Sequence, residues 1–430
     1  MQGDTEESNG RSDPTITCSR EFYRAVMEED LACIDDMSRK YGTDFFLRIP
    51  AGTGVWKGPN IHPIHFAASN RRVKSLQRLL ALGADPGIRN QHGQTALHLV
   101  ISAWPSFEIS GSKPDSKFHG AVTNMCRRAE VCLRLLCDVP VNVNTQVEDK
   151  RQQTALHLSV QCQSLPAVQI LCSYGADVNL TDSSGMTPLH MSAGILHKDI
   201  TDCLVEQGAD INMGVKSSGN TPLHLALVAI ALKSQKNLED HMTFISDLLE
   251  KGTRPDVLNN AGRTPLHEAC SFGNKLLVDL LLKHGADVNK LTSSGENCLF
   301  LFLNYPPNVR NRALMVKLLS LTSPLTVHDI KGQLPSTLML PCFAQQREQM
   351  LKLTQQPRKL LDLCKNLLYL NYIQSGKEHL KAILPETMYN SVFNCLEERV
   401  DISFETDANL FDTTNSNPQG QTVRTSSPTS

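Results

Sequence analysis

One short pattern returns along this chain at nearly constant spacing, and it constrains the fold more than any other feature. Its six copies are HPIHFAA (62–68), GQTALHL (93–99), QQTALHL (152–158), GMTPLHMSA (185–193), GNTPLHLAL (219–227) and GRTPLHEAC (262–270). Successive histidines of these copies are separated by 33, 59, 33, 34 and 43 residues. A unit this short cannot bury its own apolar face, so the period predicts a row of small modules that stack on one another.

Each copy also predicts its own local structure. In Gly185–His190 the glycine suits a turn, Thr187 suits a helix N-cap, and Pro188 suits the first helical position. His190 falls at the third helical position, from which its ring can reach back to the Thr187 hydroxyl and backbone, in place of the Glu or Gln of a capping box. A second helix should follow, ended by a glycine in the Gly-Ala-Asp segments that recur in register at 83–86, 175–179, 208–212 and 285–289.

The histidines of the repeated pattern are therefore expected to be structural. They are His65, His98, His157, His190, His224 and His267. Histidine is a common metal ligand and general base, and those roles are the alternative. His267-Glu268 resembles the start of the zinc-protease motif H-E-x-x-H, but Ser271 stands at its fifth position. Recurrence once per module at a capping position favours the structural role.

At the residues T-P-L-H and G-A-D-V-N the sequence resembles ankyrin-repeat proteins. Well-formed copies cover about residues 60–300, and weaker ones extend the match to 22–46 and 332–340. The resemblance implies an all-α solenoid of about seven to nine repeats with short β-hairpin tips, over residues 20–341. It also implies a protein partner, contacted through variable residues at the tips, and the candidates there are Gln94, Gln153, Met186, Asn220 and Arg263.

Two gaps exceed the period, by 26 and 10 residues, and both excesses fall between the first and second helix of a module. The segments near 104–119 and 233–240 are rich in Ser, Lys, Pro or Gly, which predicts loops. These loops are either tolerated surface insertions or partner contacts. Trp104 and Phe107, in an otherwise polar loop, favour contact.

The segment 342–400 departs from the repeat and is predicted to be helical. Residues 342–356 form a polar pattern, and in 359–373 Leu360, Cys364 and Leu368 share one helical face. Behind an ankyrin array, residues 359–396 resemble a SOCS box. That resemblance implies binding of elongin B/C through these three residues, and of a cullin through Leu384, Pro385 and Met388. The alternative is that these helices only cover the last repeat.

Composition excludes other classes of function. Lys plus Arg is 42 and Asp plus Glu is 44, which argues against nucleic acid or an anionic membrane as a partner. The 13 cysteines include no C-x-x-C pair, so we expect free thiols in the cytoplasm or nucleus and no metal site. The sequence shows no secretory signal, phosphate-binding glycine loop or nucleophile elbow.

Two hypotheses on function remain after the sequence analysis. The first is a monomeric, non-enzymatic interaction scaffold without catalytic residues or cofactors. The second is the substrate receptor of an elongin–cullin ubiquitin ligase, in which the same surface presents a target and 359–396 recruits the ligase. Residues 1–19 and 401–430 are expected to be disordered, the latter because its last stretch carries almost no apolar side chains.

Overall fold

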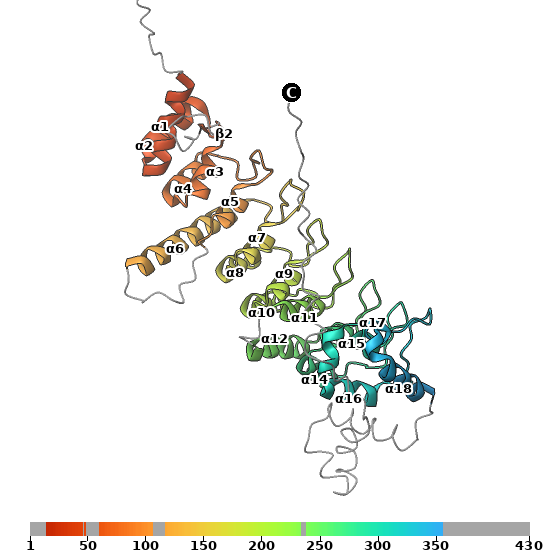
Figure 1. The fold of residues 1–430 in the computed structure, drawn as a ribbon. Helices are drawn as coiled ribbons and strands as arrows, with labels where there is room; N and C mark the ends of the chain where they lie inside the picture. Colours follow the sequence, from red (N-terminus) through yellow and green to blue (C-terminus); the bar gives the residue numbers. More distant parts are fainter. Residues whose placement is uncertain (1–13, 46, 49–59, 106–116, 234–237, 356–430) are drawn as a thin grey trace, which may run out of the picture. The chain divides into compact units, whose positions relative to one another are not determined.

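The computed structural model describes residues 14–45, 47–48, 60–105, 117–233 and 238–355 (Figure 1). The chain divides into two compact units, Met1–Ser217 and Ser218–Ser430. Phe107 lies outside the described residues, and so do the SOCS-box-like segment 359–396 and the tail 401–430. The first helix begins at Pro14, within the stretch 1–19 that we expected to be disordered.

The first unit is a succession of helix pairs. Its elements are α1 (Pro14–Glu28), α2 (Leu31–Tyr41), β1 (Leu47–Arg48), β2 (Asn60–Ile61), α3 (Pro63–Ser69), α4 (Val73–Ala81), α5 (Ala96–Ser102), α6 (Lys117–Cys137), α7 (Ala155–Gln161), α8 (Leu165–Ser173), α9 (Pro188–Ile195) and α10 (Lys198–Glu206). β1 and β2 form a two-stranded antiparallel sheet. The first helix of each pair carries the repeated histidine pattern from α3 onward, and we call it the inner helix.

The second unit continues the same pattern. Its elements are α11 (Pro222–Leu232), α12 (Leu238–Glu250), α13 (Pro265–Ser271), α14 (Lys275–Lys283), α15 (Cys298–Leu303), the 3-10 helix η3 (Pro306–Arg310), α16 (Arg312–Leu321), α17 (Ser336–Met339), the 3-10 helix η4 (Pro341–Phe343) and α18 (Ala344–Gln355). The predicted polar helix over 342–356 is thus present as α18. The degenerate repeat at 332–340 supplies only the short helix α17.

Within each unit, inner helices stack on inner helices and outer helices stack on outer helices. The inner helices α3, α5, α7 and α9 contact one another in turn, and so do the outer helices α4, α6, α8 and α10. In the second unit α11, α13 and α15 form the inner row, and α12 contacts α14 in the outer row. Most residues of each inner helix are buried, as are Leu266, Ala269 and Cys270 of α13, because the helix is covered both by its own partner helix and by the neighbouring repeats.

The two insertions form less loop than the composition predicted, because helix takes up part of each. α6 has 21 residues where the outer helix α8 has 9, so the first insertion lengthens an outer helix from Lys117 onward. α11 and α12 have 11 and 13 residues where α13 and α14 have 7 and 9. The second insertion therefore extends both helices of its pair.

The tips between repeats are turns, tied together by hydrogen bonds between successive tips. The amide N–H of Asn260 donates to the Ser218 carbonyl at 2.9 Å, that of Ser293 to Ala261 at 3.2 Å, and that of Ile330 to Ser294 at 2.9 Å. Each acceptor directly precedes the tip glycine of the previous repeat. This ladder needs close approach, and a Cβ on Gly262 would lie 2.4 Å from the Ser293 nitrogen. Glycine is therefore required there by space as well as by its φ of +69°.

Candidate protein-binding surface

The repeated histidines close the capping boxes that the sequence predicted. At Thr187, the N-cap of α9, the backbone N–H donates to Nδ1 of His190 at 3.2 Å, and the hydroxyl lies 2.8 Å from the same nitrogen. The His190 amide N–H donates back to the Thr187 hydroxyl at 3.3 Å. The same reciprocal box occurs at Thr95, Thr154, Thr221 and Thr264. Each histidine thereby satisfies N–H groups that a helix start would otherwise leave without a partner.

The second ring nitrogen of each histidine reaches the following tip. Nε2 lies 2.9–3.1 Å from a backbone carbonyl oxygen in all six cases, the acceptors being Ile88, Thr145, Met186, Met213, Arg263 and Lys290. In the five boxes with a threonine N-cap, Nε2 must donate to a carbonyl while Nδ1 accepts from the N-cap, so the ring is held neutral. Burial lowers the pKa of His65, His98, His224 and His267 to about 4.

Two repeats depart from this box. In the first, His62 replaces the N-cap threonine, and Nδ1 of the buried His65 has no hydrogen-bond partner in the described chain. In the repeat at 297–303, Phe300 replaces the histidine. Asn297 then performs both tasks, accepting from the Phe300 N–H at 2.8 Å and donating from Nδ2 to the Thr326 carbonyl at 2.8 Å.

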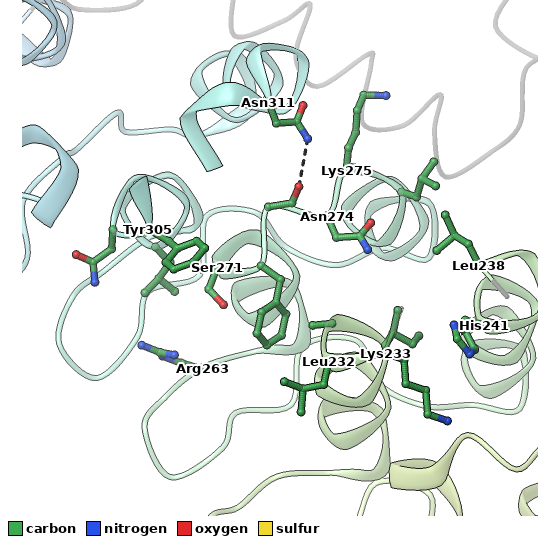
Figure 2. Close-up of a pocket in the computed structure, with 17 residues that line it drawn as sticks. Leu232, Lys233, Leu238, His241, Arg263, Ser271, Asn274, Lys275, Tyr305 and Asn311 are labelled. Carbon is green, nitrogen blue, oxygen red and sulfur yellow. Dashed lines mark hydrogen bonds between the residues drawn. The ribbon is translucent and has the colours of Figure 1, made fainter. Parts of the chain in front are cut away.

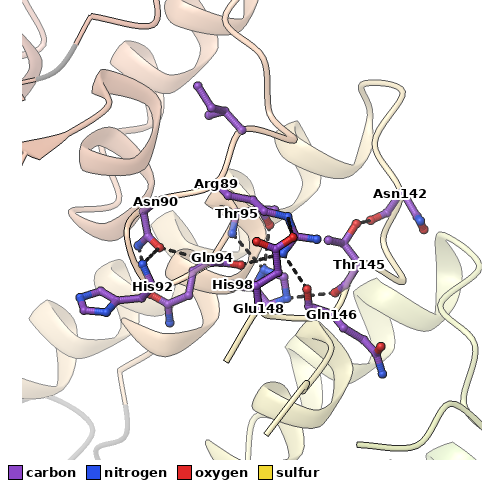
Figure 3. Close-up of polar contacts among 12 residues, drawn as sticks. Arg89, Asn90, His92, Gln94, Thr95, His98, Asn142, Thr145, Gln146 and Glu148 are labelled. Carbon is purple, nitrogen blue, oxygen red and sulfur yellow. Dashed lines mark hydrogen bonds and ion pairs between the residues drawn. The ribbon is translucent and has the colours of Figure 1, made fainter. Parts of the chain in front are cut away.

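Arg89 joins two tips across the first insertion (Figure 3). Its Nη1 donates at 2.8 Å to the carbonyls of Gly93 and Gln146, and its Nε lies 3.2 Å from Oε1 of Glu148. These contacts fix the tip at 142–153 although a 26-residue excess precedes it in the sequence. Arg89 was not among the functional residues predicted from the sequence.

The predicted contact residues differ in their access to solvent. Gln94, Met186, Asn220 and Arg263 are half-buried, and Gln94 and Asn220 each accept a hydrogen bond from a tip asparagine, Asn90 and Asn259 respectively. Two candidates are buried, Gln153 at 7% and Trp104 at 8% exposed. The prediction that Trp104 and Gln153 offer contact surface does not fit this burial. The Trp104 N–H donates to the Ile101 carbonyl at the end of α5, and the Gln153 carbonyl accepts from Val147 within the tip.

A groove in the second unit was not predicted. It has a volume of about 980 Å³, and its walls come from the ends of α11, α13 and α15 and the starts of α12, α14 and α16 (Figure 2). Four of its side chains are large, apolar and exposed: Leu232, Phe272, Leu276 and Tyr305. The sequence held one signal for it, since Gly295 and Gly332 stand 37 residues apart and so mark a further insertion.

Within the described residues, no group of three or more His, Cys, Asp or Glu side chains is arranged to hold a metal ion. Among the helices described, none is both long and apolar enough to cross a bilayer. The eleven described cysteines are free thiols. Burial raises the pKa of Cys132 and Cys137 to about 12, so these thiols are held in their neutral, unreactive form.

Comparison with protein families finds ankyrin repeats along much of the chain. Models described as ankyrin repeats match residues 60–91, 137–192, 174–236, 228–275 and 261–293. These ranges contain all the repeated histidines except His98, whose copy precedes the first insertion.

Three curated relatives show how far the similarity extends. The nuclear factor NF-kappa-B p105 subunit of Gallus gallus is 32% identical over 34% of this chain and 16% of its own length. Ankyrin repeat and SOCS box protein 16 of Homo sapiens is 28% identical over 59% of this chain and 58% of its own length. Rabankyrin-5 of Homo sapiens is 27% identical over 48% and 18%. The chain thus spans less than two thirds of each of these relatives.

Solved ankyrin domains align with part of this chain. The ankyrin repeat domain of Bcl-3 matches 56% of this chain and 93% of its own, with 23% identity and a TM-score of 0.45. That of human ASB11 matches 56% and 90%, with 20% identity and a TM-score of 0.41. From the family matches and the stacked, histidine-capped helix pairs, we conclude that this chain contains ankyrin repeats and folds as an ankyrin-repeat solenoid.

Proposed function

We propose that this protein is a non-enzymatic scaffold that binds a protein partner through its ankyrin stack. Ankyrin repeats are generally interaction modules, and the histidines able to do acid–base chemistry here are occupied by capping. The observation that carries the proposal is the exposure of large apolar side chains in the second unit. Leu232 is 81% exposed, Tyr305 56% and Leu276 47%, and all three line one groove. Exposed apolar side chains gathered in one region mark protein-binding sites.

The partner surface would combine these side chains with the predicted contact residues of the same unit, Asn220 and Arg263. Each of the two directly precedes the N-cap threonine of an inner helix, α11 and α13 respectively. We place the scaffold in the cytoplasm or nucleus as a monomer, in keeping with its free thiols.

Affinity purification of the full chain from cells, with quantitative mass spectrometry, tests this function. The variant Arg263→Glu should lose a specific protein that the wild type enriches, because it reverses a charge on the contact surface. The matched control Lys283→Glu, on the outer helix α14 of the same unit, should retain it. Binding should then be reproduced with the two purified proteins. Equal recovery of every protein by all three forms would contradict the proposal.

A second candidate function is that of a ubiquitin-ligase substrate receptor. It is supported by the similarity to ankyrin repeat and SOCS box protein 16 over 59% of this chain. It is also supported by the sequence pattern of Leu360, Cys364 and Leu368. In this proposal these residues bind elongin B/C, while Leu384, Pro385 and Met388 contact a cullin.

Co-purification with elongin B/C distinguishes the two functions. The receptor predicts a stable complex with the full chain that Leu360→Ala or Cys364→Ala abolishes without loss of helical circular dichroism. Cys342→Ala is the matched control, because Cys342 is exposed and precedes the SOCS-box-like segment. Failure of the intact full chain to retain elongin B/C would leave the plain scaffold.

A further inference from the structure

The groove in the second unit arises from a short turn between two extended ones. Three residues, 272–274, join α13 to α14. On one side α11 and α12 are lengthened, and on the other α15 and α16 are joined through η3. The short turn 272–274 therefore lies at the bottom of the groove, which we call its floor, and the longer connections on either side form its walls (Figure 2).

The floor is apolar and exposed. Phe272 is 36% exposed and Leu276 47%, and they are flanked by Leu232 from α11 and Tyr305 from the turn after α15. Phe272 and Tyr305 stand 33 residues apart, at equivalent positions of adjacent repeats. Four such side chains in one concavity provide anchoring sites for apolar side chains of a ligand.

The polar groups of the groove are mostly donors. The 17 lining residues include the cations Lys233, Arg263 and Lys275 and no Asp or Glu. Arg263 and Lys275 each pair with a carboxylate outside the lining, Glu268 at 3.7 Å and Asp279 at 3.0 Å, which offsets part of their positive charge. The lining itself still carries three cationic side chains and no carboxylate, which favours a ligand with negative charge.

Three neutral donors add to this character. Asn274 and Asn304 use their side-chain oxygens to accept from Leu277 and Ser336, and their Nδ2 groups have no partner among the described residues. The Tyr305 hydroxyl likewise makes no hydrogen bond there.

Two carbonyl groups of the floor are meanwhile occupied. Nδ2 of Asn308 donates to the Ser271 carbonyl at 2.8 Å, and Nδ2 of Asn311 donates to the Gly273 carbonyl at 3.1 Å (Figure 2). Free donors and bound acceptors suit a ligand that supplies oxygens.

We infer that this groove binds an acidic peptide segment of a protein partner, one that carries Leu, Phe or similar side chains beside Asp or Glu. Apolar side chains of the peptide contact Phe272, Leu276 and Tyr305, its carboxylates lie near Lys233 and Arg263, and its backbone carbonyls accept from Asn274 and Asn304. The inference rests on the proposed scaffold function and specifies the chemistry of the partner.

Selection of a random-peptide phage library on the full chain tests this directly. The recovered peptides should be enriched in Asp and Glu next to large apolar residues. Fluorescence anisotropy with the best synthetic peptide should give a Kd that rises ~ten-fold or more in Leu232→Ser and in Tyr305→Ala. The Kd should also rise with KCl, and when the peptide's Glu residues are replaced by Gln.

Matched controls lie in the same unit. Leu258 and Leu291 are 49% and 53% exposed at the tips, away from the groove lining, so Leu258→Ser and Leu291→Ser should leave the Kd within about two-fold. Peptides that are basic, or that bind groove and control variants equally, would overturn the inference and leave the scaffold function standing. Recovery of no peptide would also overturn it, while the affinity purification above decides the scaffold function separately.

Discussion

Nε2 of His267 lies 3.0 Å from the carbonyl oxygen of Lys290, so a capping residue of one repeat also holds the turn that leads to the next. The same ring accepts the Thr264 N–H on its Nδ1 at 3.0 Å. The bond to Lys290 spans 23 residues and couples helix capping to the stacking of repeats. One side chain thus connects local and inter-repeat structure.

Protonation of these histidines should destabilise the fold. Four of them have their pKa lowered to about 4 from the ordinary 6.5, so between these values the unfolded chain binds protons more readily than the folded chain. Stability should be complete above about pH 6.5 and fall as the pH is lowered toward 4, by at most about 1.4 kcal/mol per pH unit for each histidine. Urea midpoints measured from pH 7.5 to 4.5 check this, and a flat profile would contradict the buried neutral state.

Loss of a threonine N-cap should cost stability. Thr264→Ala removes the hydroxyl that accepts the His267 N–H, with an expected loss of about 0.5–2 kcal/mol. Thr243→Ala is the control, because Thr243 is exposed in α12 and caps nothing. Its effect should stay within about 0.5 kcal/mol. Urea unfolding of the full chain measures both, and equal effects would argue against the capping assignment.

Two glycines with the same backbone conformation should respond differently to alanine. Gly185 and Gly175 both have φ of +80°, but a Cβ on Gly185 would lie 2.4 Å from the Cβ of Lys216, while one on Gly175 would meet nothing within 4 Å. Gly175→Ala should therefore lower the free energy of unfolding by only about 1–2 kcal/mol, because alanine is unfavourable in the left-handed conformation. Gly185→Ala should cost clearly more, because the tip ladder must also shift. Similar losses in the urea midpoint would show that close packing of the tips matters little.

The carboxylate of Asp279 should stabilise the fold more than an exposed ion pair does. Asp279 lies 2.6 Å from Nζ of Lys317, whose side chain is only 11% exposed, so Asp279→Asn removes a negative charge beside a mostly buried cationic side chain. The expected loss is about 2–4 kcal/mol. Glu348→Gln removes the exposed pair with Lys352 and should cost far less. Comparable losses on thermal unfolding would contradict the burial of Lys317.

The capping interactions could be predicted because they are local. Thr187, Pro188 and His190 lie within one turn of helix, so their spacing alone sets the geometry of the box. The extent of the insertions could not be predicted in the same way. Polar composition at 104–119 and 233–240 favoured loops, yet Lys117 and Leu238 begin helices, because packing against neighbouring repeats overrides weak local preference.

The candidate contact residues show the same limit. Trp104 in a polar stretch suggested an exposed anchor, but whether a side chain is exposed depends on the repeats beside it, and here it is buried. Phe272, by contrast, directly follows a helix and was not among the predicted contact residues. It is exposed because the turns on either side are longer than its own.

The sequence by itself therefore determined the repeat, the caps and the stacked helix pairs, since each depends on contacts within a module or between modules at a fixed period. The tertiary structure alone decided which apolar side chains remain in solvent and where donors such as Asn274 and Asn304 gather without acceptors. Those properties depend on how long the helices and turns of three consecutive repeats are relative to one another. No single segment of the chain contains that information.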